Sequence, residues 1–97
     1  MLNKTIITSQ GNNYIINHED HDVVDWFNNP DNQTDTILKQ INVDCMYDPI
    51  FAGRSDMVVV DLGANIGLFS LYAQDSASRL IAVEPAPGTY NVLKKLT

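Results

Sequence analysis

The sequence of 97 residues has little of several features that mark specialised classes of protein. It contains one cysteine, so no disulfide can form within the chain, and a reducing compartment is expected. Its six Lys and Arg residues face twelve Asp and Glu residues, and a net charge of −6 argues against the basic face that nucleic acids and anionic membranes require. No apolar run approaches the roughly 20 residues that span a bilayer. Residues 1–5 also lack the pattern of a secretory signal, so the sequence predicts a cytoplasmic protein.

The charge is distributed unevenly along the chain. Residues 1–56 contain nine acidic and three basic residues, whereas residues 57–97 contain three of each. The front is therefore acidic and rich in asparagine, and the back is neutral and apolar. We interpret residues 1–50 as an N-terminal cap and residues 51–97 as the beginning of a different structural unit.

The front of the chain has the patterns of a hairpin and short helices. Two β-branched and aromatic runs, residues 4–9 and 14–16, flank a turn of Gly and Asn, which predicts a β-hairpin. Apolar residues between positions 23 and 27 follow acidic residues that suit a helix start, and residues 36–43 have helical spacing. Pro49 and Gly53 predict an irregular connection over residues 44–53.

Two features of the front, a pair of histidines and a single cysteine, are of types that can bind metals or act as nucleophiles, but neither has the surroundings that such a role needs. His18 and His21 lie three residues apart, whereas the helical zinc signature separates its histidines by four, so we predict no metal site. Cys45 has no base or positive charge near it in the sequence, and a lone cysteine is more often a small buried apolar group.

The back of the chain alternates between strand and helix patterns. Residues 57–62 form a continuous apolar run, typical of a strand buried on both faces of a parallel sheet. The apolar spacing from Ile66 predicts a helix to about Gln74, and residues 80–83 predict a second buried strand. A further helix is expected over residues 90–96. The order β-α-β-α predicts an α/β fold with a parallel sheet.

The loop after the first of these strands has the composition of a ligand site. A strand that ends in small residues and leads into a helix can present backbone N–H groups to a ligand. Gly63 and Gly67 lack side chains that would keep a ligand from the backbone. Glu84 follows the next strand, where a carboxylate can accept hydrogen bonds from two ribose hydroxyls. These residues together predict an adenosine-type cofactor.

The loop does not have the dinucleotide fingerprint. That fingerprint needs glycine at three positions, G-x-G-x-x-G, which correspond here to Gly63, Asn65 and Leu68. One of the three is met, so NAD and FAD are disfavoured. The spacing present is an acid at Asp61 followed by Gly63 and Gly67.

The loop and the second strand together resemble the FkbM family of S-adenosylmethionine-dependent methyltransferases. The residues that carry the resemblance are DLGANIGLFS at 61–70, IAVEP at 81–85, and Tyr90 with Leu93. The resemblance covers about residues 51–97. It implies a Rossmann-like class I methyltransferase fold, of which this chain holds the first β-α-β-α unit behind a hairpin and helical cap. It also implies methyl transfer to a hydroxyl oxygen of a sugar or another small acceptor.

The resemblance also assigns roles to residues. Asp61, Gly63, Ala64 and Gly67 are expected around the methionine part of S-adenosylmethionine, with Asn65 where many methyltransferases have a glycine. Glu84 is expected to bind the ribose. Phe69 and Tyr90 are expected to pack rather than to contact the ligand. No residue of the sequence is nominated as catalytic.

Two strands are fewer than the family's fold contains, so we expect a truncated unit. The regions that would contact adenine and hold the acceptor are not expected here, and this chain alone is not expected to position both substrates. Two parallel strands leave an open sheet edge, which predicts self-association or a complementing chain. The alternative to a methyltransferase portion is a non-catalytic α/β module that binds a nucleoside ligand or acts through association.

Overall fold

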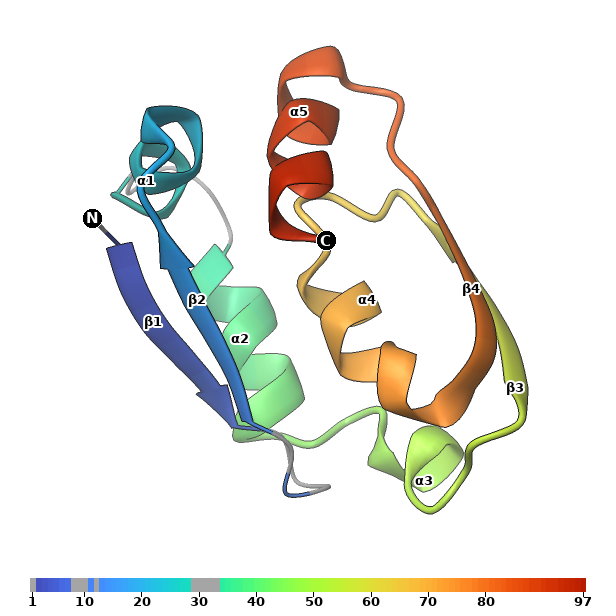
Figure 1. The fold of residues 1–97 in the computed structure, drawn as a ribbon. Coiled ribbons are helices and arrows are strands. Elements are labelled where there is room, and N and C mark those ends of the chain that lie inside the picture. Colours follow the sequence, from blue (N-terminus) through green and yellow to red (C-terminus); the bar gives the residue numbers. More distant parts are fainter. Residues whose placement is uncertain (1, 8–10, 12, 29–33) are drawn as a thin grey trace.

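The computed structural model of the chain describes residues 2–7, 11, 13–28 and 34–97. Its elements are β1 (Leu2–Ile7), β2 (Asn13–His18), α1 (His21–Asn28), α2 (Thr34–Asn42), α3 (Asp48–Phe51), β3 (Met57–Leu62), α4 (Leu68–Ala73), the 3₁₀ turn η1 (Gln74–Ser76), β4 (Ala77–Val83) and α5 (Pro87–Leu96). Figure 1 shows α2, α4 and α5 between the β1–β2 hairpin on one side and the β3–β4 sheet on the other. None of the described helices is long and apolar enough to cross a membrane.

The front of the chain forms the predicted hairpin and helices. β1 pairs with β2 in antiparallel register from Leu2 opposite His18 to Ile7 opposite Asn13. Part of the expected turn, residues 8–10 and 12, lies outside the described residues. α1 is capped by Asp20, whose Oδ1 accepts a hydrogen bond of 2.9 Å from the backbone N–H of Asp22. The hairpin forms its own two-stranded sheet and does not extend the parallel sheet.

The back of the chain forms the predicted β-α-β-α unit with shifted boundaries. β3 and β4 are parallel neighbours, and α4 lies between them in sequence. α4 begins at Leu68 and not at Ile66, because Gly67 has a φ of 95°, outside the right-handed helical region. The 3₁₀ turn then ends the helical segment, and β4 begins at Ala77, earlier than the predicted Leu80.

α3 replaces part of the expected irregular connection. Pro49 lies in its first turn, where the missing backbone N–H would have had no helical partner. The prediction that Pro49 marks a non-helical connection is therefore wrong. The short helix brings Phe51 into the core, where its side chain is 7% exposed.

The β3–β4 sheet is covered on one face only by the described residues. Val59 is 7% exposed, but Val58, Val60 and Leu62 are 68%, 54% and 77% exposed. The prediction of a strand buried on both faces is therefore wrong for this part of the chain, because the helices all lie on one side of the sheet (Figure 1). Neither strand has a second partner strand among the described residues, so the expected open edge is present. Association through that edge stays a prediction.

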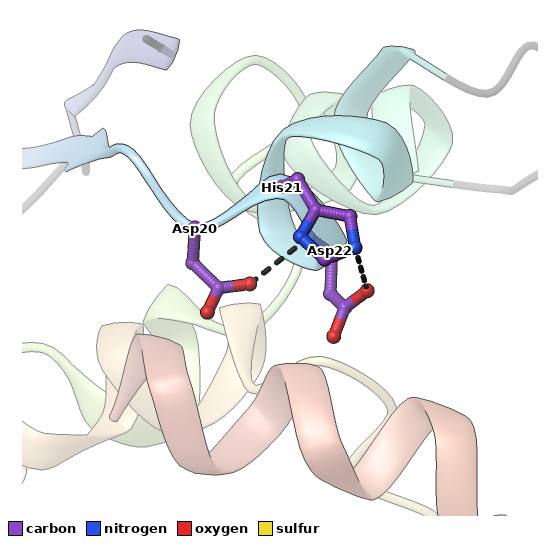
Figure 2. Close-up of side chains that lie close together, drawn as sticks. All are labelled: Asp20, His21 and Asp22. Carbon is purple, nitrogen blue, oxygen red and sulfur yellow. Dashed lines mark hydrogen bonds and ion pairs between the residues drawn. The ribbon is translucent and has the colours of Figure 1, made fainter.

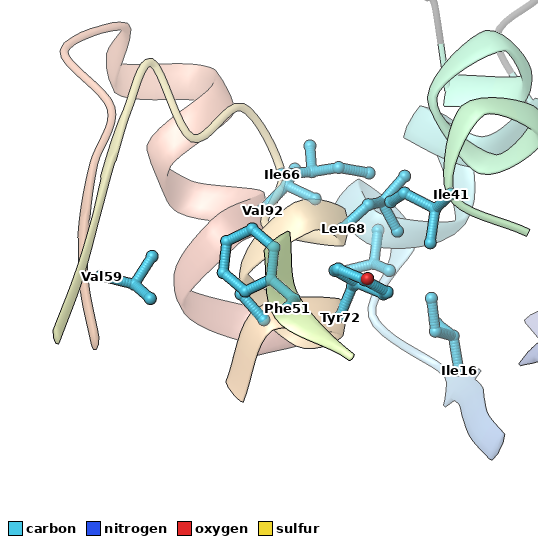
Figure 3. Packing of buried hydrophobic residues seen from close by; sticks show 10 residues of the cluster. Ile16, Ile41, Phe51, Val59, Ile66, Leu68, Tyr72 and Val92 are labelled. Carbon is cyan, nitrogen blue, oxygen red and sulfur yellow. The ribbon is translucent and has the colours of Figure 1, made fainter. Parts of the chain in front are cut away.

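One hydrophobic core joins the front and back of the chain. The cluster takes residues from both parts: Ile16, Val23, Ile41, Phe51, Val59, Ile66, Leu68, Tyr72, Ala73 and Val92. Figure 3 shows Phe51, Leu68 and Tyr72 in its middle, between Val59 on one side and Ile16 on the other. Tyr47 and Phe69 meet edge to face with ring centroids 4.7 Å apart. Among the described residues this core therefore spans the boundary proposed near residue 50, and the division into domains stays a prediction.

Because one face of the sheet is covered, the same substitution should have a large effect at Val59 and a small one at Val60. Val59→Thr keeps the shape and β-branching but buries a hydroxyl group, so we expect a loss of about 1–3 kcal/mol in the free energy of unfolding. The matched change Val60→Thr places the hydroxyl in solvent and should change it by less than about 0.5 kcal/mol. Urea denaturation of the two variants measures this. Equal losses would show that the outer face is buried in solution.

Candidate functional site

The parallel pairing of β3 and β4 brings the two parts of the sequence motif together. Leu62 lies opposite Val83 in the register, so the loop after β3 and Glu84 after β4 leave the sheet at the same end. The backbone N–H of Ala64 donates a 2.9 Å hydrogen bond to the carbonyl of Val83. This bond continues the link between the two strands into the loop.

Glu84 joins the loop directly. Its Oε1 accepts a 2.8 Å hydrogen bond from the backbone N–H of Asn65, and its Oε2 accepts one of 3.1 Å from the N–H of Ala86. An ionised carboxylate has about four acceptor positions, so both oxygens retain capacity for further donors. Glu84 thus holds the loop and can still accept hydrogen bonds from a ligand.

A cavity of about 280 Å³ lies beside this loop. Its lining residues are Ile37, Gln40, Tyr47, Asp61, Gly63, Ala64, Asn65, Ile66, Leu68 and Phe69. Four of the six predicted site residues, Asp61, Gly63, Ala64 and Asn65, are among them. Glu84 and Gly67 are not, and the ligand roles of all six stay predictions.

Two of the residues that line the cavity, Asp61 and Asn65, carry side-chain oxygen acceptors. Oδ1 of Asn65 is buried without a hydrogen bond within the described part of the chain. Oδ2 of Asp61 accepts a 2.8 Å hydrogen bond from the hydroxyl of Ser70, which is 4% exposed. Beside them Gly63 has a φ of 70°, and no atom lies within 4 Å of the place where a Cβ would stand. Residues with side-chain oxygens therefore line the same cavity as Gly63.

Gly67 has a packing role. A Cβ at this position would stand 2.6 Å from Cδ1 of Leu93 and 2.8 Å from Cγ2 of Thr97. The residue is also held at positive φ. Glycine is therefore favoured here, because any other residue would be held at positive φ and its side chain would displace the ends of the Leu93 and Thr97 side chains.

The expected set of free backbone N–H groups is largely absent from the loop. The N–H groups of Ala64 and Asn65 donate to Val83 and Glu84, and that of Gly67 donates to the carbonyl of Ala64 at 3.0 Å. These three N–H groups are therefore used within the chain, and the expectation that the loop presents backbone N–H groups to a ligand stays a prediction. Asp61 and Asn65, which line the cavity, also carry side-chain oxygens.

Three cavity residues come from the front of the chain and were missed. Ile37 and Gln40 lie one turn apart on α2, and Tyr47 directly precedes α3. Helical spacing in the sequence predicts that Ile37 and Gln40 share a face of a helix. No local signal says that this face meets a loop more than twenty residues later, because that depends on tertiary packing of α2 against α4.

Comparison with known proteins adds a partial identification. The chain resembles fungal methyltransferases. It is 46% identical over 61 residues to methyltransferase sdnD of Sordaria araneosa, which is 61% of this chain and 23% of that protein. It is 35% identical over 65 residues to methyltransferase 1 of Beauveria bassiana, covering 65% of this chain and 26% of that protein. It thus spans about a quarter of the length of these two relatives.

A third similarity is to a small part of a much larger protein. The chain is 47% identical over 58 residues to the AMB antimetabolite synthetase AmbE of Pseudomonas aeruginosa, which covers 56% of this chain and 3% of that protein. No family model matches the chain. No solved structure matches it either.

The methyltransferase similarity extends into the front of the chain. A continuous stretch that covers 61% or 65% of 97 residues contains residues 40–50 wherever it lies. The sequence resemblance was placed on residues 51–97, so these matches reach further back. They include the segment that carries Gln40 and Tyr47.

A cluster of polar groups between α1 and α5 forms a second candidate site. Asp20, His21 and Asp22 each offer one atom that could coordinate a metal ion, and these three atoms lie within 4.8 Å of one another. Figure 2 shows His21 between the two carboxylates. Nζ of Lys95 lies 2.8 Å from Oδ2 of Asp20 and 3.2 Å from Oδ2 of Asp22. The ammonium group already supplies the positive charge that a cation would bring. We interpret the cluster as an ionic link between the cap and α5.

His18, the other histidine of this segment, has a structural role. Its Nδ1 accepts a 3.2 Å hydrogen bond from the backbone N–H of Asp20. Because Nδ1 is an acceptor, Nε2 of the neutral ring carries the proton and donates to the carbonyl of Lys95 at 3.1 Å. Nε2 therefore holds the end of β2 to α5, while Nδ1 is bonded to the segment between β2 and α1.

Gly67 provides a test of the close approach between the loop and α5. Gly67→Ala should lower the free energy of unfolding by about 3 kcal/mol, because the new methyl group overlaps Leu93 and the residue must keep a positive φ. Gly63→Ala is the matched control with similar φ and open space, and should cost about 1–2 kcal/mol. Chemical denaturation measures both. A smaller loss at Gly67 than at Gly63 would contradict the packing role.

The link through Lys95 predicts a pH dependence of stability. Hydrogen bonds from Lys95 lower the pKa of Asp20 below its ordinary value of 3.8. The pKa of Asp22 is lowered too, by Lys95 and then by Asn91. Hydrogen bonds to Asp20 and Asp22 raise the pKa of Lys95 above 10.5. Carboxylates with a lowered pKa stabilise the fold above their unfolded pKa, and that contribution is lost as the pH falls through the folded value. The contribution of Lys95 is present below pH 10.5 and is lost as the pH rises through its folded pKa.

Lys95→Met should therefore lower the urea midpoint at neutral pH and lose this effect in acid. The difference in urea midpoint between Lys95→Met and the unmodified chain should be greatest between about pH 5 and 9 and should shrink below about pH 4. Lys94→Met is the matched control, since Lys94 is exposed and pairs with no carboxylate of the described residues. A deficit of Lys95→Met that stays constant down to pH 2 would contradict the ionic link.

Proposed function

We propose that this chain is the cofactor-binding part of an S-adenosylmethionine-dependent methyltransferase of the FkbM type. The observation that carries the proposal is the meeting of the two motif segments. Four motif residues line one cavity, and Glu84 is bonded to the same loop through the N–H of Asn65. The similarity to two fungal methyltransferases supports the same class of reaction.

The residues present fit S-adenosylmethionine. The cavity offers the carboxylate of Asp61 and the unpartnered Oδ1 of Asn65, both of which suit an ammonium group. The open space at Gly63 lets a ligand approach the backbone. Outside the cavity, Glu84 retains acceptor capacity for ribose hydroxyls. These groups correspond to the two ends of a nucleoside that carries an amino acid.

The contribution of this chain to the reaction is binding and orientation. Bound S-adenosylmethionine supplies a methyl group on a sulfonium centre, and transfer in line to an acceptor depends chiefly on position. Asp61 and Asn65 would hold the charged end of the cofactor, and Glu84 would fix the ribose. We propose a hydroxyl oxygen of a sugar or another small molecule as the acceptor, following the resemblance. No catalytic residue is assigned.

Titration calorimetry with S-adenosylhomocysteine tests this proposal. We expect heat of binding from the chain, and an increase in Kd of about tenfold or more for Glu84→Gln, which loses charge-assisted hydrogen bonds to the ribose. Glu19→Gln is the matched control, because Glu19 is exposed and lies in the cap. NAD should give no heat. Absence of binding at millimolar S-adenosylhomocysteine would overturn the proposal for this chain, and equal affinity for NAD would favour a general nucleoside-binding module.

A further inference from the structure

The cavity beside the motif loop has a second wall that the motif does not supply. One wall consists of the loop after β3, with Asp61, Gly63 and Asn65. The other consists of Ile37 and Gln40 on α2 together with Tyr47. A ligand in this cavity would therefore lie between the motif loop and the front of the chain.

Tyr47 is fixed in this wall by several contacts. Its ring packs edge to face on Phe69 at 4.7 Å and lies 6.3 Å from the ring of Tyr72. Its carbonyl accepts the N–H groups of Ile50 and Phe51 at 3.0 and 3.2 Å, which starts α3. Tyr47 is thus held by the same aromatic cluster that packs against α4.

Gln40 is held by its backbone and has an amide side chain at the cavity. Its carbonyl accepts the N–H of Met46 at 3.2 Å, so the turn that leads to Tyr47 is anchored on Gln40 itself. The side chain is half-buried on α2, one turn after Ile37. A glutamine amide presents two N–H donors as well as an oxygen acceptor.

The polar groups of the two walls complement each other. The loop contributes two residues with side-chain oxygens, Asp61 and Asn65, and Oδ1 of Asn65 is buried without a hydrogen-bond partner within the described part of the chain. The front wall contributes amide N–H donors from Gln40, and none of the lining residues is Lys or Arg. An α-amino acid has an ammonium group for the first set and a carboxylate for the second. A nucleobase or a sugar has no such pair of opposite charges.

We propose that Gln40 and Tyr47 belong to the cofactor site and that Gln40 hydrogen-bonds the carboxylate of the amino-acid end of the cofactor. This inference rests on the proposed function. The adenosine end then extends towards Glu84, which lies outside the cavity but is bonded to the same loop. The similarity to methyltransferases, which includes residues 40–50, is consistent with a shared use of this segment.

Two ligands separate this inference from the proposed function. S-adenosylhomocysteine carries the amino-acid end, whereas 5′-methylthioadenosine has the same nucleoside without it. For Gln40→Ala in the full chain, calorimetry should show a Kd for S-adenosylhomocysteine raised by about tenfold or more, since a hydrogen bond to a charged group is lost. The Kd for 5′-methylthioadenosine should change by less than about twofold. Gln40→Glu should weaken S-adenosylhomocysteine further, because it places like charges together.

Gln74→Ala is the matched control, because Gln74 is exposed in η1 and does not line the cavity. Circular dichroism and urea midpoints establish that each variant folds. Unchanged binding of S-adenosylhomocysteine to Gln40→Ala, or an equal loss for both ligands, would overturn the role of Gln40. Failure of the unmodified chain to bind either ligand would instead overturn the proposed function, and this inference with it.

Discussion

The parallel pairing of β3 with β4 is the constraint on which the arrangement of the candidate site depends. With Leu62 opposite Val83, the chain leaves both strands at one end of the sheet, and the bond from Ala64 to Val83 holds the loop there. Glu84 then lies within hydrogen-bond distance of Asn65, nineteen positions earlier in the sequence. Gly67 completes the arrangement, because its missing side chain lets α5 close over the loop.

The cap and the α/β unit act as one structure around this loop. Ile16, Val23 and Ile41 enter the same core as Val59 and Val92, and the aromatic contacts of Tyr47 cross the boundary suggested by charge. Some of the acidic residues in the front of the chain therefore have a structural role that composition alone does not show. Asp20 and Asp22 bind Lys95 of α5, so part of the negative charge is used in joining the two ends of the chain.

Local patterns predicted the elements of this fold, and long-range packing determined what they missed. The apolar run of β3 and the helical spacing after Ile66 identified a strand and a helix correctly, because both signals depend on near neighbours. The exposure of Val58 and Val60 could not be predicted, since it depends on which elements cover the sheet. The residues that line the cavity divide in the same way, into those that a local pattern indicates and those that depend on long-range packing. Motif spacing found Asp61 and Asn65, whereas Gln40 enters through the packing of α2 on α4.

The contacts between α1 and α5 have a consequence for the order of folding. The bonds from Asn91 and Lys95 to Asp22 join residues 69 and 73 positions apart, whereas the β1–β2 hairpin is closed by neighbours in sequence. Contacts of high sequence separation require the closure of a long loop, which slows their formation. On a ribosome the hairpin can therefore form early, but the carboxylates of α1 must wait for α5 to emerge. Docking of α1 on α5 is thus a later step than closure of the hairpin.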